Sequence, residues 1–159
     1  MFQLLHTLNT DTNRVFETPN DTNSIPVKAG AKIFEGALIG KTDTGYGRPL
    51  QAGDTAIGFA KDYTDNTNGA DGEKNCEVKA KGKVSLFISG ITLSDVGNNV
   101  YATDDNTFTL TETNNSLVGK LIRFERTDYG IVAFDFLAIN TQQTATPAPQ
   151  TEQPVNEGE

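Results

Sequence analysis

The sequence is poor in the residues on which catalytic sites and disulfide-stabilised folds most often depend. It has one histidine, His6, one cysteine, Cys76, and no tryptophan. A single cysteine cannot form an intrachain disulfide, so the fold cannot depend on oxidation. Any Ser-His-Asp or Cys-His site would have to use His6, which stands in a stretch without serine or cysteine. We therefore expect no enzyme activity, and we expect Cys76 to serve as a small buried apolar residue.

Basic charge and long apolar runs are also scarce. Lysine and arginine number 13 against 21 aspartates and glutamates, which gives a formal net charge of −8 at pH 7. A nucleic-acid binder needs a basic face to neutralise phosphates, and an acidic chain is repelled by an anionic membrane surface. No segment is long and apolar enough to cross a bilayer, and residues 1–10 lack the basic start and continuous apolar run of a signal peptide. We expect neither nucleic acid nor membrane as a partner, and synthesis in the cytoplasm.

What the chain does contain is short alternating apolar segments separated by glycine, asparagine and aspartate. Residues 95–110 are typical: residues 100–102 are a β-forming run, residues 104–106 favour a turn, and Phe108 and Leu110 alternate with threonines. Turn signals recur at intervals of about 8–12 residues. The pattern predicts an all-β fold, a compact sandwich or partly open barrel of short antiparallel strands. It leaves room for at most one short helical turn, at residues 95–98.

Residues 73–89 carry the longest strand pattern. Apolar residues alternate with charged ones from Cys76 to Ala80, and the alternation resumes after Gly82. A bend or bulge at Gly82 would let one long strand serve two sheets or turn the corner of a barrel. The last strand, residues 131–137, is apolar on both faces, which indicates a central strand or a subunit contact.

The chain divides into three parts. Residues 1–24 are polar and turn-prone around a short apolar piece, so they are interpreted as an extended N-terminal arm or, equally, as an edge strand of the domain. Residues 25–139 form the β-domain. Residues 140–159 are rich in Thr, Gln, Pro and Glu and have no Lys or Arg. Ordering a backbone costs about 1–2 kcal/mol per residue, which this composition cannot offset, so the segment is predicted to be a disordered acidic tail.

The loop at residues 62–73 is a candidate cation site, because it is crowded with Asp, Asn and Gly, and Asp104 and Asp105 are interpreted in the same way. When the loop is aligned on Gly69, an EF-hand loop would begin at Thr64 and end at Asn75, so both charged anchors of that motif are missing. Turns closed by Asp and Asn side chains explain the composition better, and a weak calcium site remains the alternative. We expect no metal and no cofactor.

Ten short segments occur in an order and spacing that resembles one known family. They are Val27-Lys28-Ala29-Gly30, Glu35-Gly36-Ala37-Leu38-Ile39-Gly40, Gly45-Tyr46-Gly47-Arg48-Pro49-Leu50, Ala52-Gly53-Asp54, Ile57-Gly58-Phe59-Ala60, Asp65-Asn66 with Gly69-Ala70-Asp71-Gly72, Asp95-Val96-Gly97, Val100-Tyr101-Ala102, Asp105-Asn106-Thr107-Phe108-Thr109-Leu110 and Ser116-Leu117-Val118-Gly119. Over residues 26–136 the chain is similar to the bacteriophage capsid decoration (cement) proteins, which coat the assembled head. The resemblance implies an all-β homotrimer on the outer capsid surface of the virion. It also implies the major capsid protein as partner, synthesis in the host cytoplasm and no catalysis.

The capsid contacts are expected in two places. Lys79, Lys81 and Lys83 form the one basic stripe, which is interpreted either as a solvated strand face or as a contact with acidic capsid patches. The apolar residues of the arm, Phe2, Leu4 and Leu5, are candidates for anchors that become ordered on docking. The alternative function is a phage tail, fibre or other surface β-module that binds carbohydrate through its tyrosines, Tyr46, Tyr63, Tyr101 and Tyr129.

Overall fold

The computed structural model describes residues 6–138, with residues 18–20 described by their backbone alone. In this part of the chain the strands are joined by turns, and the only helical element is the 3₁₀-helix η1 (Leu93–Asp95), two residues before the predicted helical turn. The strands are β1 (Phe16–Pro26), β2 (Lys32–Ile33), β3 (Leu38–Lys41), β4 (Gly47–Pro49), β5 (Thr55–Ala60), β6 (Thr64–Asp65), β7 (Asn75–Phe87), β8 (Asn99–Ala102), β9 (Phe108–Thr109), β10 (Ser116–Arg126) and β11 (Tyr129–Asp135).

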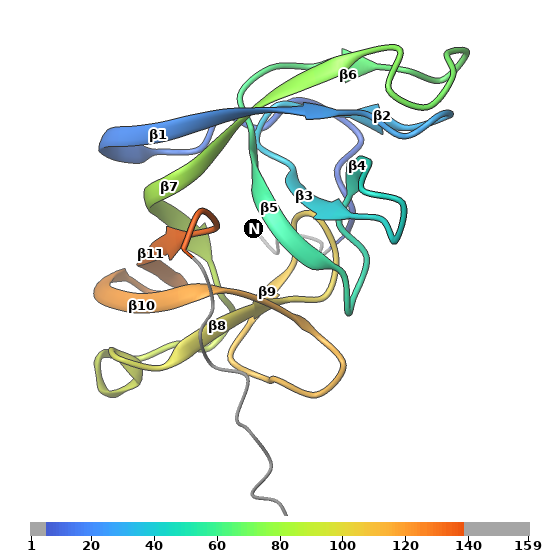
Figure 1. The fold of residues 1–159 in the computed structure, drawn as a ribbon. Coiled ribbons are helices and arrows are strands. Elements are labelled where there is room, and N and C mark those ends of the chain that lie inside the picture. The colour runs from blue at the N-terminus through green and yellow to red at the C-terminus, as the bar shows by residue number, and fades with distance from the viewer. Residues whose placement is uncertain (1–5, 139–159) are drawn as a thin grey trace, which may run out of the picture.

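These strands form one curled antiparallel sheet and a small two-stranded sheet. The main sheet has the order β4-β3-β5-β7-β11-β10-β8-β9, with β1 paired to β7, and β2 pairs with β6. The main sheet bends into a half-barrel, which is visible in Figure 1 as strands wrapped around a common centre. The all-β prediction is therefore confirmed, in its partly open barrel form. No helix in the described part of the chain has the length and apolar character needed to span a membrane.

Strand β7 is the strand on which the sheet turns. Lys79 pairs with both β1 and β5, whereas Lys81 and Val84 pair with both β1 and β11. Because a strand has two edges, β1 must follow one edge of β7 while β5 and β11 share the other in succession. The partner changes between Lys79 and Lys81, just before Gly82, whose φ of 153° lies outside the range that L side chains prefer. Gly82 itself pairs regularly with Phe134 of β11, and the register shift opposite it lies in β1, between Glu17 and Asp21.

Contacts between the two ends of the sheet keep it curled. The backbone N–H of Leu38, in β3, donates to the carbonyl oxygen of Asp105 at 2.9 Å, and Gln51 forms an antiparallel bridge with Asp104. Ile88, just after β7, forms a parallel bridge with Phe108 of β9. The loop between β8 and β9 therefore reaches back to the strands at the opposite end of the sheet.

The concave side of the half-barrel holds an aromatic core. Phe59 of β5 is fully buried at its centre, and its ring lies 5.1 Å from that of Phe134 and 5.9 Å from that of Phe16, centroid to centroid. Both pairs meet edge to face, the arrangement that the charge distribution of aromatic rings favours. Phe134 comes from β11, which lies between β7 and β10 as its two apolar faces predicted.

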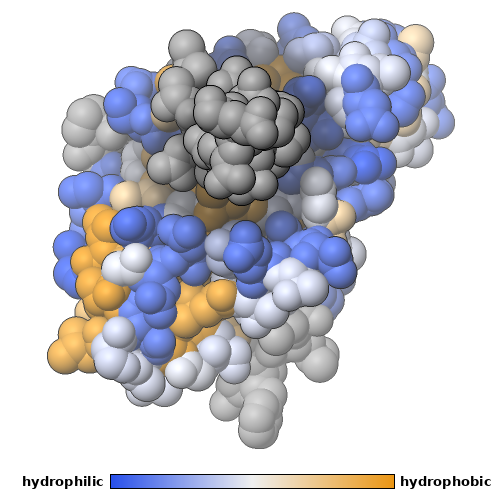
Figure 2. All heavy atoms as spheres, turned by 60° about the horizontal axis from the view of Figure 1, so that its bottom comes forward, coloured by the Kyte–Doolittle hydropathy of each residue, from blue (hydrophilic) through white to orange (hydrophobic). Residues whose placement is uncertain are grey.

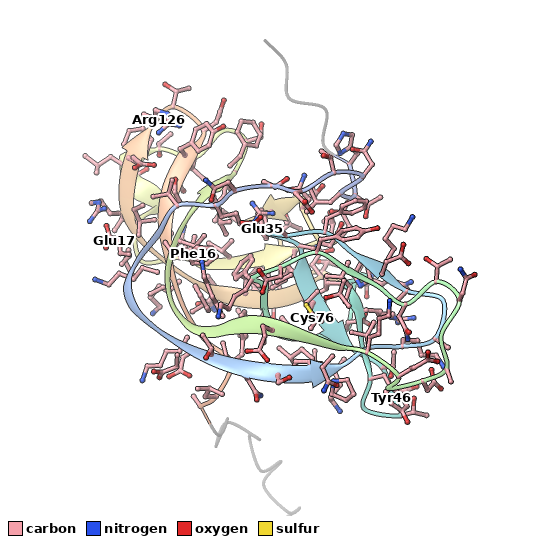
Figure 3. All side chains as sticks on the ribbon, turned by 90° about the horizontal axis from the view of Figure 1, so that it is seen from above. Phe16, Glu17, Glu35, Tyr46, Cys76 and Arg126 are labelled. Carbon is pink, nitrogen blue, oxygen red and sulfur yellow. The ribbon has the colours of Figure 1, made fainter. Side chains whose placement is uncertain are left out.

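Residues 6–15, here called the N-terminal strap, pack on the domain and lead into β1. Leu8 is buried, and the N–H of Thr12 donates a hydrogen bond to the carbonyl oxygen of Glu35 at 2.8 Å. The N–H of Ser85 donates to the carbonyl oxygen of Val15 at 2.9 Å. Figure 3 shows the strap running along one side of the body before it turns back as β1, with Phe16 directed inward. The expected boundary between residues 24 and 25 falls inside β1. Residues 1–5 and 139–159, which include the predicted acidic tail, lie outside the described residues.

The approach of the strap to Gly36 gives a first prediction. Gly36 and Gly30 both have positive φ, 83° and 77°, but a Cβ on Gly36 would clash with the carbonyl oxygen of Thr12 while one on Gly30 would meet nothing. Gly30→Ala should therefore cost about 1 kcal/mol of unfolding free energy from backbone strain alone, and Gly36→Ala about 3 kcal/mol because the strap must also shift. Urea unfolding of the two variants measures the difference. Equal losses of unfolding free energy in the two variants would show that the strap does not pack closely against Gly36.

Candidate functional site

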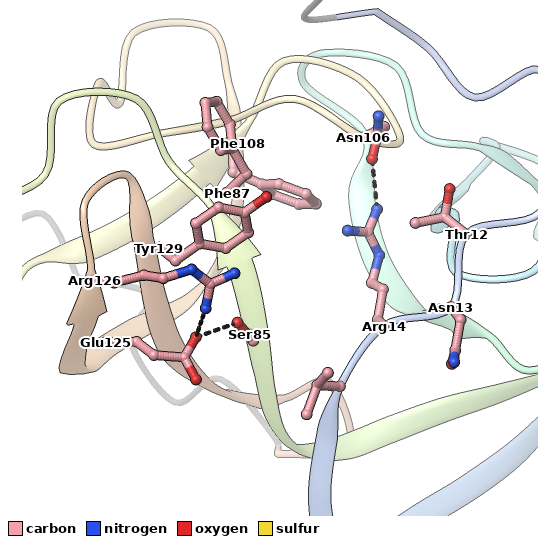
Figure 4. Close-up of a pocket in the computed structure, with 11 residues that line it drawn as sticks. Thr12, Asn13, Arg14, Ser85, Phe87, Asn106, Phe108, Glu125, Arg126 and Tyr129 are labelled. Atoms are coloured by element: carbon pink, nitrogen blue, oxygen red, sulfur yellow. Dashed lines mark hydrogen bonds and ion pairs between the residues drawn. The ribbon is translucent and has the colours of Figure 1, made fainter. Parts of the chain in front are cut away.

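A cavity of about 270 Å³ lies where the N-terminal strap passes β7 and the β10–β11 hairpin. Its walls come from four segments that are far apart in the sequence, as Figure 4 shows. They are Thr12, Asn13, Arg14 and Val15 of the strap, Ser85 and Phe87 of β7, Asn106 and Phe108 at the start of β9, and Glu125, Arg126 and Tyr129 of the hairpin. The cavity exists only because the strap is in place.

Arg14 forms the strap side of the cavity. Its guanidinium carbon lies 5.2 Å from the centroid of the Phe108 ring and 5.6 Å from that of Phe59, within the range of cation–π attraction. Its Nε donates to the carbonyl oxygen of Gly36, and Nη2 donates to Oδ1 of Asn106 at 2.8 Å. Burial lowers the pKa of Arg14 to about 10, although the nearby charge of Asp105 opposes that shift. Among the described residues no carboxylate forms an ion pair with this partly buried cation.

Asp105 fastens the start of the strap. Its side chain is 1 % exposed, and its carboxylate accepts hydrogen bonds from the hydroxyl of Thr7 and from the N–H of Leu8, the latter at 3.1 Å. Burial raises the pKa of Asp105, while the bonds from Thr7 and Leu8 and the charge of Arg14 act against the increase. The strap is therefore held by the buried carboxyl group of Asp105 and the partly buried guanidinium of Arg14, and the surroundings of both disfavour the charged form.

The hairpin supplies the opposite wall. The guanidinium carbon of Arg126 lies 3.9 Å from the centroid of the Tyr129 ring, which itself meets Phe87 edge to face at 5.4 Å. Glu125 accepts a hydrogen bond from Ser85 at 2.7 Å and another from Arg126 at 3.3 Å. The cavity thus combines aromatic walls with two guanidinium groups and one carboxylate.

The predicted lysine stripe lies on β7 and is already engaged within the domain. The Nζ atom of Lys79 lies over the ring of Phe16, 3.6 Å from its centroid. Lys81 forms an ion pair with Asp135 at 3.6 Å, and Lys83 forms one with Glu17 at 3.6 Å. Exposed ion pairs of this kind are worth about 0–1 kcal/mol each. An acidic partner would have to compete with Glu17 and Asp135 for the stripe.

The loop at residues 62–73 is closed by side chains bonding to its own backbone, as its composition indicated. Asp65 accepts hydrogen bonds from the hydroxyl and N–H of Thr67, which lower the pKa of Asp65 to about 2. The buried amide of Asn66 donates to the carbonyl oxygens of Val27, Lys28 and Ala70. Within residues 6–138 no group of three or more His, Cys, Asp or Glu side chains is placed to hold a metal ion.

The remaining sequence candidates lie apart from the cavity. Cys76 is fully buried in a second apolar cluster formed by β1, β3 and β7, and burial raises the pKa of its thiol. His6 is exposed at the start of the strap, where its carbonyl oxygen accepts a hydrogen bond from Asn106 at 3.2 Å. The anchor candidates Phe2, Leu4 and Leu5 lie outside the described residues.

Several large apolar side chains on β10 and the adjoining η1 turn are exposed. They are Leu93, Val96, Leu117 and Ile122, which are 72 %, 39 %, 48 % and 37 % exposed. The N–H of Gly97 donates to the carbonyl oxygen of Leu121 at 2.7 Å, which holds the η1 turn against β10. Figure 2 shows hydrophobic side chains gathered on the left of the face that carries β8, β10 and η1.

Sequence reasoning missed the Arg14–Asp105 arrangement. Arg14 stands in a polar run and Asp105 in a turn-forming triplet, so neither has an apolar pattern that indicates burial. The only signal was the isolated pair Val15-Phe16 directly after Arg14, which marks the point where the strap meets the core.

Comparisons with protein-family models, with curated proteins and with solved structures found no match.

Asp105 generates the second prediction. Because its pKa is raised on folding, the native state holds the proton more tightly than the unfolded chain. Its contribution to stability is therefore greatest below pH 3.8, the ordinary value for aspartate, and is lost as pH rises through the raised pKa. Asp105→Asn keeps an acceptor for Thr7 and Leu8 but carries no charge.

The variant should thus become more stable relative to wild type as pH rises above 3.8 and through the raised pKa of Asp105. Urea unfolding of both proteins across this range measures the difference. A difference that stays constant with pH would contradict the burial of an ionisable carboxyl group at this position.

Proposed function

We propose that this chain is a non-enzymatic bacteriophage capsid decoration (cement) protein. It binds the outer surface of the assembled head as a homotrimer and stabilises the lattice of the major capsid protein through several weak contacts at once. The observation that carries the proposal is the ordered resemblance over residues 26–136, which runs through nearly the whole described domain.

The residues that carry the resemblance have structural roles here. Gly36 admits the strap, Gly47 lies where a side chain would meet Ile25 and Ile39, and Gly58 lies against Val78. Such close approaches are determined by the fold, so a chain that shares their order and spacing is expected to share the same body. This supports a common architecture with the decoration proteins, whose task is to present a rigid shape.

The surface of the domain suits weak, repeated contact. The exposed side chains of Leu93, Val96, Leu117 and Ile122 provide apolar area, and the ion pairs of Lys81 and Lys83 could be exchanged for pairs with acidic groups of a partner. Each contact alone is weak, but a trimer that engages three subunits converts modest affinities into avidity through high effective concentration. A ligand that binds only the assembled shell stabilises it by mass action.

Truncation of the N-terminal arm should weaken binding to the capsid. A variant that lacks residues 1–5 loses Phe2, Leu4 and Leu5 but keeps the bonds from Thr7 and Leu8 to Asp105, so its domain should unfold as the full chain does. Its binding to expanded heads, measured by co-sedimentation, should fall at least about tenfold if three arms contribute together. A variant that lacks residues 139–159 is the matched truncation control and should bind normally.

Two results would count against the proposal. Unchanged binding of the variant without residues 1–5 would remove the arm from the mechanism. Full-length protein that neither co-sediments with heads nor appears on their exterior in electron micrographs would remove the decoration function itself.

A further inference from the structure

The cavity beside the N-terminal strap has chemistry that the capsid role does not use. We propose that it is a binding site for a carboxylate group, held between Arg14 and Arg126. The site would be present in the free protein as well as in any assembled form, so the proposal of a carboxylate site does not depend on the capsid function proposed above.

Arg14 provides the main reason. Two of its three guanidinium nitrogens have acceptors, the carbonyl oxygen of Gly36 and Oδ1 of Asn106. The third, Nη1, has no hydrogen bond among the described residues, and in Figure 4 this end of the group points across the cavity toward Tyr129 and Phe87. A partly buried cation without a bonded anion loses hydration that is not replaced, and a carboxylate entering the cavity would supply charge-assisted hydrogen bonds to it.

The charges around the cavity favour an anion despite the acidity of the whole chain. Its lining holds two guanidinium groups, Arg14 and Arg126, against one carboxylate, Glu125, which leaves one positive charge in excess. Glu125 is already bonded to Ser85 and Arg126. The other acidic group near Arg14, Asp105, does not line the cavity, and its carboxylate is bonded to Thr7 and Leu8.

The volume of the cavity and the residues of its walls indicate which class of ligand it can hold. The volume of about 270 Å³ lies just below the range of about 300–1,000 Å³ that is typical of drug-sized ligands. Phe87, Phe108 and Tyr129 provide apolar surface against which a short aliphatic stem can pack. The site therefore fits a carboxylate on a few methylene groups, carried either by a glutamate side chain of a polypeptide or by a small free dicarboxylate.

The experiment titrates the full chain with three probes and follows binding by calorimetry and by NMR shifts of the Tyr129 and Phe87 rings. The probes are the tripeptide acetyl-Gly-Glu-Gly-amide, the same peptide with glutamine, and glutarate. Because Arg14 also holds the strap through its bonds to Gly36 and Asn106, the test variant is Arg126→Gln. The control is Arg123→Gln, a residue of the same strand that is similarly exposed, 54 % against 61 %, and pairs with Glu17 outside the cavity.

The glutamate peptide or glutarate should bind, the glutamine peptide should not, and binding should weaken at higher salt. Arg126→Gln should weaken binding at least about tenfold, since it removes a charged hydrogen-bond partner, and Arg123→Gln should leave it unchanged. Tighter binding of the peptide assigns the site to a polypeptide, and tighter binding of glutarate assigns it to a free metabolite. No binding at about 10 mM, equal binding of both peptides, or equal loss in the two arginine variants would overturn the proposal.

Discussion

The architecture depends on the hydrogen bonding of one thirteen-residue strand, β7. Because β1 occupies one of its edges while β5 and β11 share the other, the sheet must change direction where the partner changes, between Lys79 and Lys81 and next to Gly82. That change of direction curls the sheet around Phe59 and brings the loop between β8 and β9 back toward β3. A residue with a Cβ at Gly82 would oppose the backbone conformation that this bend requires.

The N-terminal strap completes the open half-barrel with polar contacts. Arg14 lies beside the rings of Phe59 and Phe108, and Asp105 bonds the first residues of the strap. Buried charged groups are costly unless they are well paired, so they stabilise the fold less than they determine where the strap lies. The same arrangement creates the cavity, and it turns a surface segment into part of a rigid body that can present fixed contacts.

Much of the fold could be predicted from the sequence, and little of the cavity. The alternation of apolar and polar residues and the regular turns predicted an antiparallel sandwich or partly open barrel, and Gly82 marked the region where β7 changes partner, because both features are local. Arg14 and Asp105 meet only through long-range packing, which no local pattern records. The lysines of β7 were visible as a stripe, but their pairing with Glu17 and Asp135 depends on the register of three strands.

The central claim is that the domain begins with the strap, well before the predicted boundary at residue 25. Native-state hydrogen exchange tests it directly, because the N–H groups of Thr12 and Leu8 bond to Glu35 and Asp105 while that of Ser85 bonds to the strap. These amides should be protected to nearly the same free energy as those in the middle of β7. Exchange of the Thr12 and Leu8 amides at unfolded rates, with β7 still protected, would contradict the claim.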